Sequence, residues 1–140
     1  MTETPSAAAP PPQVWPVLRA RDARALIRFL VDAFGFEEAV VYGEGERVDH
    51  AELSWPPGGG VMLGSVPEGA AAEGPPAPGT FAAYVVTDET DALHARARAA
   101  GARITAEPHD TDYGSRDFSA TDPEGNRWSF GTYRGHPRAS

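Results

Sequence analysis

His50 and Glu52 stand two positions apart in an alternating segment of the chain. In an extended strand both side chains would project from the same face, where they could ligate a metal ion or act as a base and its orienting carboxylate. A solvent-exposed strand that carries two polar residues is the commoner reason for this spacing. His109 lies with Asp110 and Asp112 in a segment rich in turn residues, where the cluster could form a lid or, as the commoner case, a surface turn.

Other catalytic chemistry is poorly represented in the sequence. The 140 residues include no cysteine, which excludes disulfides, zinc–thiolate sites and thiol nucleophiles. There is also no Ser-His-Asp spacing, no P-loop and no dinucleotide-binding fingerprint. We therefore predict no catalytic residue and no cofactor.

The charge balance limits the partners that the chain can have. A net charge of -8 argues against nucleic acid and against anionic lipid. No apolar run is long enough to span a membrane, and residues 1–13 lack the basic and apolar segments of a signal peptide. We expect this N-terminal segment to form a disordered tail. The lack of cysteine fits a reducing compartment, so the expected location is the cytoplasm.

The elements that must position these side chains occur twice in the same order. Alternation and turn residues predict strand, helix and three strands in residues 14–65 and again in residues 80–134. The strands are expected at residues 14–20, 36–42, 48–55, 61–65, 80–87, 103–107, 114–121 and 127–133. Residues 66–79, rich in Ala, Gly and Pro, are the expected linker, and residues 135–140 a second tail.

The two predicted helices have matching ends. Asp22 and Asp88 are the expected N-caps, and Gly35 and Gly101 are the expected stops. Both pairs have the same offset of 66 in the numbering, which indicates an internal duplication. The predicted fold class is α+β, with two tandem βαβββ modules.

The second module closes with the sequence "YGSRDFSATDPEGNRWSFGTY". A duplicated βαβββ unit with this "R-x-F…DP-x-GN" run resembles the vicinal oxygen chelate superfamily, which includes glyoxalases, bleomycin-resistance proteins and extradiol dioxygenases. The resemblance implies two curved sheets around a cup, a fold that a second chain often completes. We accordingly expect a homodimer.

The resemblance also implies up to four metal-ligand positions, two in the first strands and two in the last strands of the modules. The corresponding residues here are Trp15, Leu63, Phe81 and Ser129. None of them supplies the imidazole, carboxylate or thiolate that Zn, Ni, Mn or Fe requires. A register shift by a single position would not help, since it substitutes only Val14, Pro16, Met62, Ala82, Trp128 or Phe130. We therefore predict no metal site and favour a protein that is not an enzyme.

Strand alternation predicts which side chains line the cup. The expected inward sets are Trp15, Val17 and Arg19; His50, Glu52 and Ser54; Phe81, Ala83 and Val85; and Asp117, Ser119 and Thr121. Trp55 and Trp128 are assigned to the core, and Arg116 to an internal ion pair that fixes a hairpin. The predicted ligand-binding residues are Trp15, Arg19, His50, Glu52, Phe81, Asp117, Ser129 and Tyr133.

This lining suits a planar aromatic or cationic compound, which rings can stack on or hold through their π electrons. It is similar to the bleomycin-resistance branch, in which an acidic dimer without a metal sequesters a drug such as an antibiotic. The alternative is a metal-dependent lyase, isomerase or dioxygenase with a displaced site built from His50, Glu52 and His109. A third possibility is a dimeric regulatory module whose cup is filled by its own side chains. The sequence does not identify the ligand or show whether a dimer exchanges strands.

Overall fold

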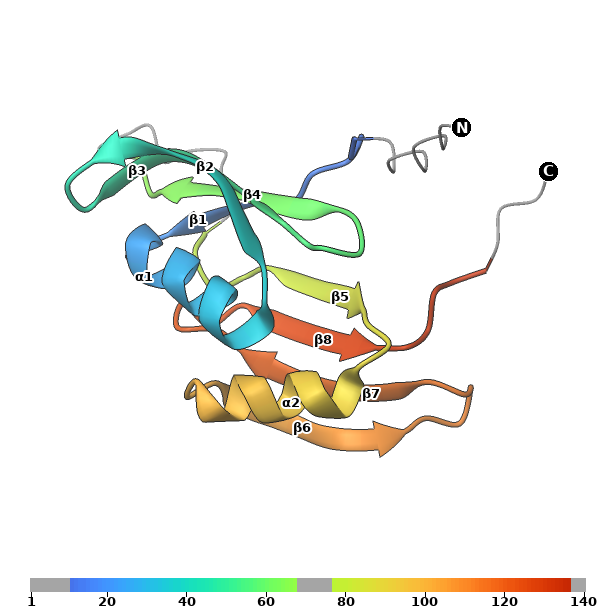
Figure 1. Cartoon of the computed structure of the whole chain (residues 1–140). Helices are drawn as coiled ribbons and strands as arrows, with labels where there is room; N and C mark the ends of the chain where they lie inside the picture. Colours follow the sequence, from blue (N-terminus) through green and yellow to red (C-terminus); the bar gives the residue numbers. More distant parts are fainter. Residues whose placement is uncertain (1–10, 68–76, 137–140) are drawn as a thin grey trace, which may run out of the picture.

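Each half of the chain forms a four-stranded mixed sheet with one helix packed against it (Figure 1). The computed structural model describes residues 11–67 and 77–136. The expected tails and linker therefore lie largely outside the described residues. The α+β fold with two βαβββ modules is confirmed.

The first sheet has the strand order β1-β4-β3-β2, with β1 parallel to β4 and the other neighbours antiparallel. The elements of this module are β1 (Val17–Ala20), α1 (Ala23–Phe29), the π-helical turn η1 (Leu30–Phe34), β2 (Glu37–Glu44), β3 (Arg47–Ser54) and β4 (Gly60–Ser65). The second sheet has the equivalent order β5-β8-β7-β6. Its module consists of β5 (Ala82–Val86), α2 (Thr90–Ala99), β6 (Arg103–Asp110), β7 (Arg116–Thr121) and β8 (Arg127–Gly131).

The predicted ends of the first helical segment are confirmed. The Asp22 carboxylate caps α1 by accepting a hydrogen bond from the Ala25 N–H at 3.1 Å. The segment ends at Gly35, whose φ of 88° is a conformation that glycine adopts without strain. Between these ends the apolar side chains of Leu26 and Leu30 are buried, as the helical spacing predicted.

The predicted N-cap of the second helix is wrong by a single position. Glu89, rather than Asp88, occupies the N-cap position of α2. The Thr87 hydroxyl accepts the Glu89 N–H at 3.0 Å, while the Asp88 side chain turns away to pair with Arg134. The helix therefore begins later than the sequence pattern indicated.

This shift changes the offset between the modules from 66 to 67. Leu18 and Leu63 pair on the core-facing side of the first sheet, and Val85 and Phe130 pair on the core-facing side of the second, so positions that are equivalent in both pairing and burial are 67 apart. The first module has one additional position between its helix N-cap and its terminal glycine, and the π-helical turn accommodates it. Because side chains alternate along a strand, this small error inverts the predicted faces of β4 and β5.

One hydrophobic core joins the two modules. Phe34, at the end of η1, packs edge-on against Phe130 of β8, with ring centroids 4.7 Å apart, and against Trp128 at 5.7 Å. Trp128 is fully buried, as predicted, whereas Trp55 is only partly buried and packs against the margin of this core. The modules therefore pack through their helices and helix-facing strand residues.

The turn "DPEGN" contributes to both modules. Asp122 is 5% exposed and accepts hydrogen bonds from the Asn126 N–H, the Asn126 side-chain amide and the Trp128 indole. Glu124 reaches the first module, where its carboxylate accepts the backbone N–H groups of Arg21 and Asp22, each at 2.9 Å. This turn therefore anchors its own hairpin and links it to the start of α1.

Arg116 forms ion pairs, one of them across the β6–β7 hairpin as predicted, but the pairs are exposed rather than internal. Its guanidinium donates to Asp91 on α2 and to Asp110 on β6, at 2.9 to 3.1 Å. The hydrogen bond and charge of Arg116 hold the pKa of Asp91 below its ordinary value. The interaction ties β7 to the neighbouring helix and strand.

Candidate ligand-binding site

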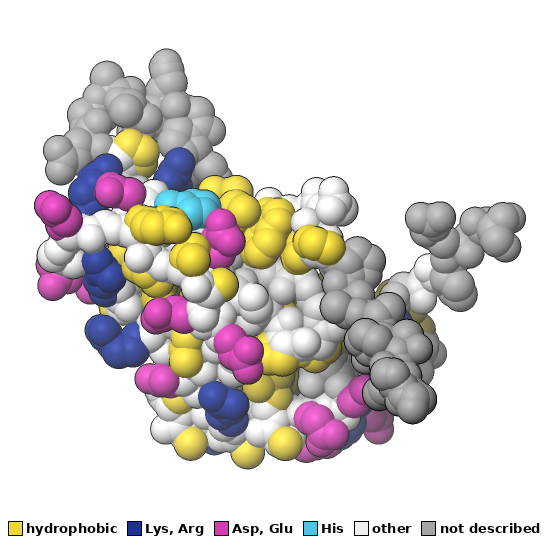
Figure 2. Space-filling view, turned by 45° about the horizontal axis from the view of Figure 1, so that its top comes forward, with side chains coloured by type: hydrophobic (Ala, Val, Ile, Leu, Met, Phe, Trp, Pro, Cys, Tyr) yellow, Lys and Arg dark blue, Asp and Glu magenta, His cyan; other side chains and the backbone are white. Residues whose placement is uncertain are grey.

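The face of the first sheet that points away from α1 carries polar and aromatic side chains. Leu18, Ala51 and Leu53 are buried against the helix, which leaves His50 and Glu52 on the open face, as alternation predicted. Figure 2 turns the top of Figure 1, where this sheet lies, toward the reader and shows hydrophobic, acidic and histidine side chains together.

Two contacts organise this open face. His50 Nε2 and Glu52 Oε2 lie 2.8 Å apart, and the Tyr42 ring lies nearly parallel to the His50 ring with centroids 6.5 Å apart. Trp15, which precedes β1, lies against Gly60, where an added Cβ would stand 3.0 Å from the indole. The structure thus places three of the predicted ligand-binding residues on one sheet face.

The open face of the second sheet carries Asp117 and Ser129. Asp117 accepts hydrogen bonds from the Tyr84, Tyr113 and Ser115 hydroxyls. Ser129 lies within 2.9 Å of the Ser119 hydroxyl on the neighbouring strand. The predicted orientation of the β7 residues is confirmed by burial of Phe118 and Ala120 on the other side.

Tyrosines surround the Asp117 carboxylate. Tyr84, Tyr113 and Tyr133 are all exposed, and the rings of Tyr113 and Tyr133 meet edge-on with centroids 5.5 Å apart. Loss of hydration and the nearby charge of Asp117 raise the pKa of Tyr113, whose hydroxyl donates to the Asp117 carboxylate at 3.2 Å. Gly131 leaves room for this cluster, because an added Cβ would collide with Asp117 and with the Tyr84 hydroxyl.

Tyr84, Tyr113 and Tyr42 were not among the predicted site residues. Tyr84 was missed because the offset of 66 placed its neighbours Ala83 and Val85 inward. In the structure those neighbours pack against the core, and Tyr84 takes the open face. An offset of 67, had it been read from the strands, would have identified this tyrosine.

Phe81 does not face the open side of the sheet. It belongs to the partly buried residues packed against the core, and its ring lies 5.4 Å from that of Trp128. Phe81 nevertheless meets another predicted residue, because it lines a cavity of about 250 Å³ together with Arg19 of β1. The predicted residues are therefore spread over two sheet faces and one small cavity.

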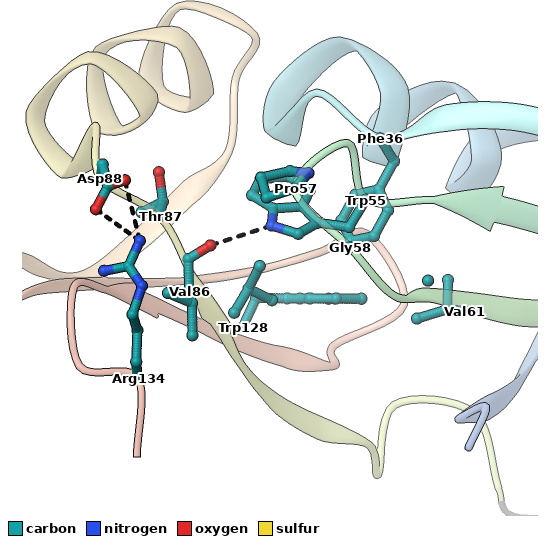
Figure 3. Close-up of a pocket in the computed structure, with 12 residues that line it drawn as sticks. Phe36, Trp55, Pro57, Gly58, Val61, Val86, Thr87, Asp88, Trp128 and Arg134 are labelled. Carbon is teal, nitrogen blue, oxygen red and sulfur yellow. Dashed lines mark hydrogen bonds and ion pairs between the residues drawn. The ribbon is translucent and has the colours of Figure 1, made fainter. Parts of the chain in front are cut away.

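A pocket with mainly apolar walls lies at the junction of the modules, where the β3–β4 turn meets the end of β5 (Figure 3). The Trp55 indole donates to the Val86 carbonyl at 3.1 Å across this junction. The cavity measures about 410 Å³, a volume that suits a small organic ligand. Asp88 and Arg134 lie beside it and form an ion pair. Sequence reasoning missed this pocket because its walls come from both modules.

The residues present do not fit the metal site of metal-dependent superfamily members. With the corrected offset of 67, the positions that the resemblance implies are occupied by Trp15, Met62, Ala82 and Ser129. Leu63, the earlier assignment, is buried on the helix side. These four side chains offer no imidazole, carboxylate or thiolate to a divalent metal.

The structure does not bring His109 to the other two residues of the displaced site, although His50 and Glu52 are in contact. His109 lies on β6, in the second sheet, and its ring Nδ1 contacts the Glu107 carbonyl at 2.8 Å, whereas His50 and Glu52 lie on β3. Within residues 11–67 and 77–136, no three His, Cys, Asp or Glu side chains are grouped so that they could hold a metal ion. In the same ranges, no helix is long and apolar enough to cross a membrane.

Comparisons with solved structures agree with this architecture. TioX from Micromonospora sp. ML1 is 26% identical, with a TM-score of 0.72 over 85% of this chain and 98% of its own. TnmS3, an antibiotic-binding protein from Streptomyces sp. CB03234, is 23% identical, with a TM-score of 0.62 over 83% of this chain and 90% of its own. A glyoxalase/bleomycin resistance protein/dioxygenase from Nocardioides is 20% identical, with a TM-score of 0.64 over 96% and 93%. The last two similarities show the fold alone.

A search of curated protein sequences found no significant match. Residues 13–130, however, match a family model, and that range spans both modules. The two sheets, their strand order and this match lead to one assignment: the chain belongs to the Glyoxalase/Bleomycin resistance protein/Dioxygenase superfamily, the vicinal oxygen chelate proteins.

Proposed function

We propose that this chain is a non-catalytic protein that sequesters a small aromatic or cationic compound, such as an antibiotic. The observation that carries the proposal is the replacement of metal-ligating chemistry by Trp15, Met62, Ala82 and Ser129 at the implied ligand positions. The sheet faces around these positions carry aromatic rings and carboxylates, which can bind organic molecules.

The two open faces offer the same kinds of chemical group. The first offers the Trp15 indole with the Glu52 carboxylate, and the second offers the Tyr84 and Tyr133 rings with the Asp117 carboxylate. Aromatic faces and carboxylates together favour planar cations. We infer that a homodimer brings the first sheet of one chain opposite the second sheet of its partner and so encloses the ligand.

Arg19 and Phe81 are included in the proposed site, at its side. They line the same small cavity beside β1 and β5, so a ligand that enters between these strands would contact both. The description of TnmS3 as an antibiotic-binding protein is consistent with this class of ligand.

A metal titration tests the absence of catalytic metal chemistry. Calorimetry of the chelator-treated protein with Ni(II), Zn(II), Mn(II) and Fe(II) should show no stoichiometric tight binding. Tight binding of one metal ion per chain, lost in the His50→Ala variant, would instead support the metal-dependent enzyme. The His50–Glu52 contact is the observation that keeps this second candidate.

Substitution of Trp15 tests the binding surface. The Trp15→Ala variant should fold normally but lose most of its affinity for aromatic ligands, because removal of an aromatic ring on which a nucleobase stacks costs about 1–3 kcal/mol and a planar aromatic ligand should stack similarly. Binding is measured by calorimetry against a panel of aromatic and cationic antibiotics. The Tyr42→Ala variant removes another aromatic ring from the same sheet face, and its affinity is compared with that of Trp15→Ala. Equal affinity in the wild type and Trp15→Ala would remove Trp15 from the proposed site.

A further inference from the structure

The pocket between the modules can be explained by comparing two equivalent turns, one in each module. The β3–β4 turn and the β7–β8 turn are equivalent, since Trp55 N–H bonds to the Gly59 carbonyl and Asp122 N–H bonds to the Asn126 carbonyl in the same way. Each turn approaches the segment that leads into the helix of the other module. The two junctions should therefore look alike unless their side chains differ.

Their side chains do differ. In the second turn, Glu124 fills its junction, where its side chain is only 6% exposed and accepts two backbone N–H groups. Pro57 stands at the equivalent place in the first turn and carries no group that could reach across. The junction at Pro57 consequently retains a cavity of about 410 Å³.

This junction pocket, defined by Trp55, Pro57, Val85, Val86, Asp88 and Arg134, has apolar walls and one charged edge (Figure 3). The partly buried Trp55 forms one wall, and the fully buried Trp128 lies beneath. At the edge, Arg134 Nη2 donates to both carboxylate oxygens of Asp88, at 2.9 and 3.0 Å.

The two members of this ion pair are held differently. Asp88 lies between β5 and α2, directly before the N-cap residue of the helix, so its backbone position is fixed. Arg134 follows the last strand and reaches the pair through a long side chain, while the exposure of the two side chains is similar, at 60% for Arg134 and 67% for Asp88. An exposed ion pair of this kind contributes only about 0–1 kcal/mol, so a competing cation can displace the guanidinium.

We propose that the junction pocket binds a planar aromatic cation whose charged group replaces the Arg134 guanidinium at Asp88 and whose ring lies against Trp55. An indole face attracts cations, and the net charge of -8 favours their approach. An anion would have to displace the short Asp88 side chain from a fixed backbone, which its geometry opposes. The inference rests on the proposed ligand class but assigns a site separate from the open sheet faces.

Three probes of the same shape and different charge test this site: 2-naphthamidine, 2-naphthamide and 2-naphthoate. Binding to the full chain is followed by NMR through the indole N–H signal of Trp55 and by calorimetry. We expect the amidine to shift this signal and to bind about tenfold more tightly than the amide, with the naphthoate weakest, as an exposed ion pair together with a cation–π contact would give.

Variants then separate the roles of the two charges. Asp88→Asn should abolish the preference for the amidine over the amide. Arg134→Gln should tighten amidine binding severalfold, because the competing guanidinium is gone. Arg47→Gln is the matched control. Arg47 forms an exposed ion pair with Asp49, 2.8 Å long, and neither residue lines this pocket, so the variant should leave amidine affinity unchanged.

Equal affinity of the three probes, amidine binding unaffected by Asp88→Asn, or weaker amidine binding in Arg134→Gln would each overturn the inference. The open-face variants Glu52→Gln and Asp117→Asn separate it from the proposed function. If those variants lose amidine binding and Asp88→Asn retains it, the open faces bind the cation and the junction pocket does not. If Asp88→Asn alone loses it, the junction pocket is supported. Absence of amidine binding to the wild type would refute the pocket.

Discussion

Removal of the Glu124 carboxylate should loosen the contact between the two modules. This carboxylate accepts hydrogen bonds from the backbone N–H groups of Arg21 and Asp22, each 2.9 Å long. The Glu124 side chain is only 6% exposed, so water has little access to these bonds. Hydrogen bonds to a charged group contribute roughly 1.5–3 kcal/mol each. The 3.4 Å contact with the exposed Arg21 guanidinium adds little.

We expect Glu124→Ala to lower the free energy of unfolding by about 2–4 kcal/mol, the lower end applying if water reaches the freed N–H groups. Glu124→Gln should lose about half as much, because its amide oxygen can accept only one of the two donors well. Urea denaturation followed by Trp fluorescence gives both values.

Glu107→Ala is the matched control for this measurement. Glu107 also forms ion pairs through its carboxylate, but its side chain is 64% exposed, so its removal should change stability by no more than about 0.5 kcal/mol. If Glu124→Ala and Glu107→Ala have the same small effect, then the Glu124 bonds do not hold the modules together and the reasoning from their burial is refuted.

Two further predictions concern the second module. Gly131→Ala should destabilise the protein and disturb the tyrosine cluster, because the new methyl group collides with Asp117 and Tyr84; thermal unfolding and tyrosine NMR signals would detect this, and an unchanged cluster would contradict it. The lowered pKa of Asp91 means that its pairing with Arg116 stabilises the fold at neutral pH and that this contribution is lost as the pH falls below about 4. The Asp91→Asn variant should therefore show a weaker loss of stability in acid than the wild type, and parallel pH profiles of the two proteins would refute the assignment.

Much of the architecture could be predicted from local sequence signals. Asp22 and Gly35 mark the ends of the first helical segment, and alternation in β3 and β7 correctly sorts residues such as Ala51 and Phe118 to the core. These signals depend on neighbouring residues only, through capping, glycine conformation and the period-two alternation of a strand. They are sufficient to predict two βαβββ modules.

The register between the modules could not be predicted in the same way. A π-helical turn at Leu30–Phe34 absorbs one additional position, so the glycines that end the helices remain 66 apart while the strands are 67 apart. Backbone hydrogen bonding inside a helix leaves no mark in residue types that would reveal this turn. The error exchanged the faces of Tyr84 and Phe81, two residues on which the candidate site depends.

The junction pocket required knowledge of how the modules dock. Trp55 looks like a core residue in its own strand, and Asp88 looks like a helix cap. Only the packed modules show that Trp55 bonds to Val86 and that Asp88 pairs with Arg134. Contacts between residues so far apart in sequence are decided by tertiary packing.

The most direct test of the proposed binding function is equilibrium dialysis of the chelator-treated protein against aromatic and cationic antibiotics, with mass spectrometry of the recovered compound. We predict saturable binding without added metal and recovery of the compound with its mass unchanged. Binding that appears only after a divalent metal is restored would contradict the metal-free site, and recovery of a modified product would contradict the proposal by showing that the chain is an enzyme.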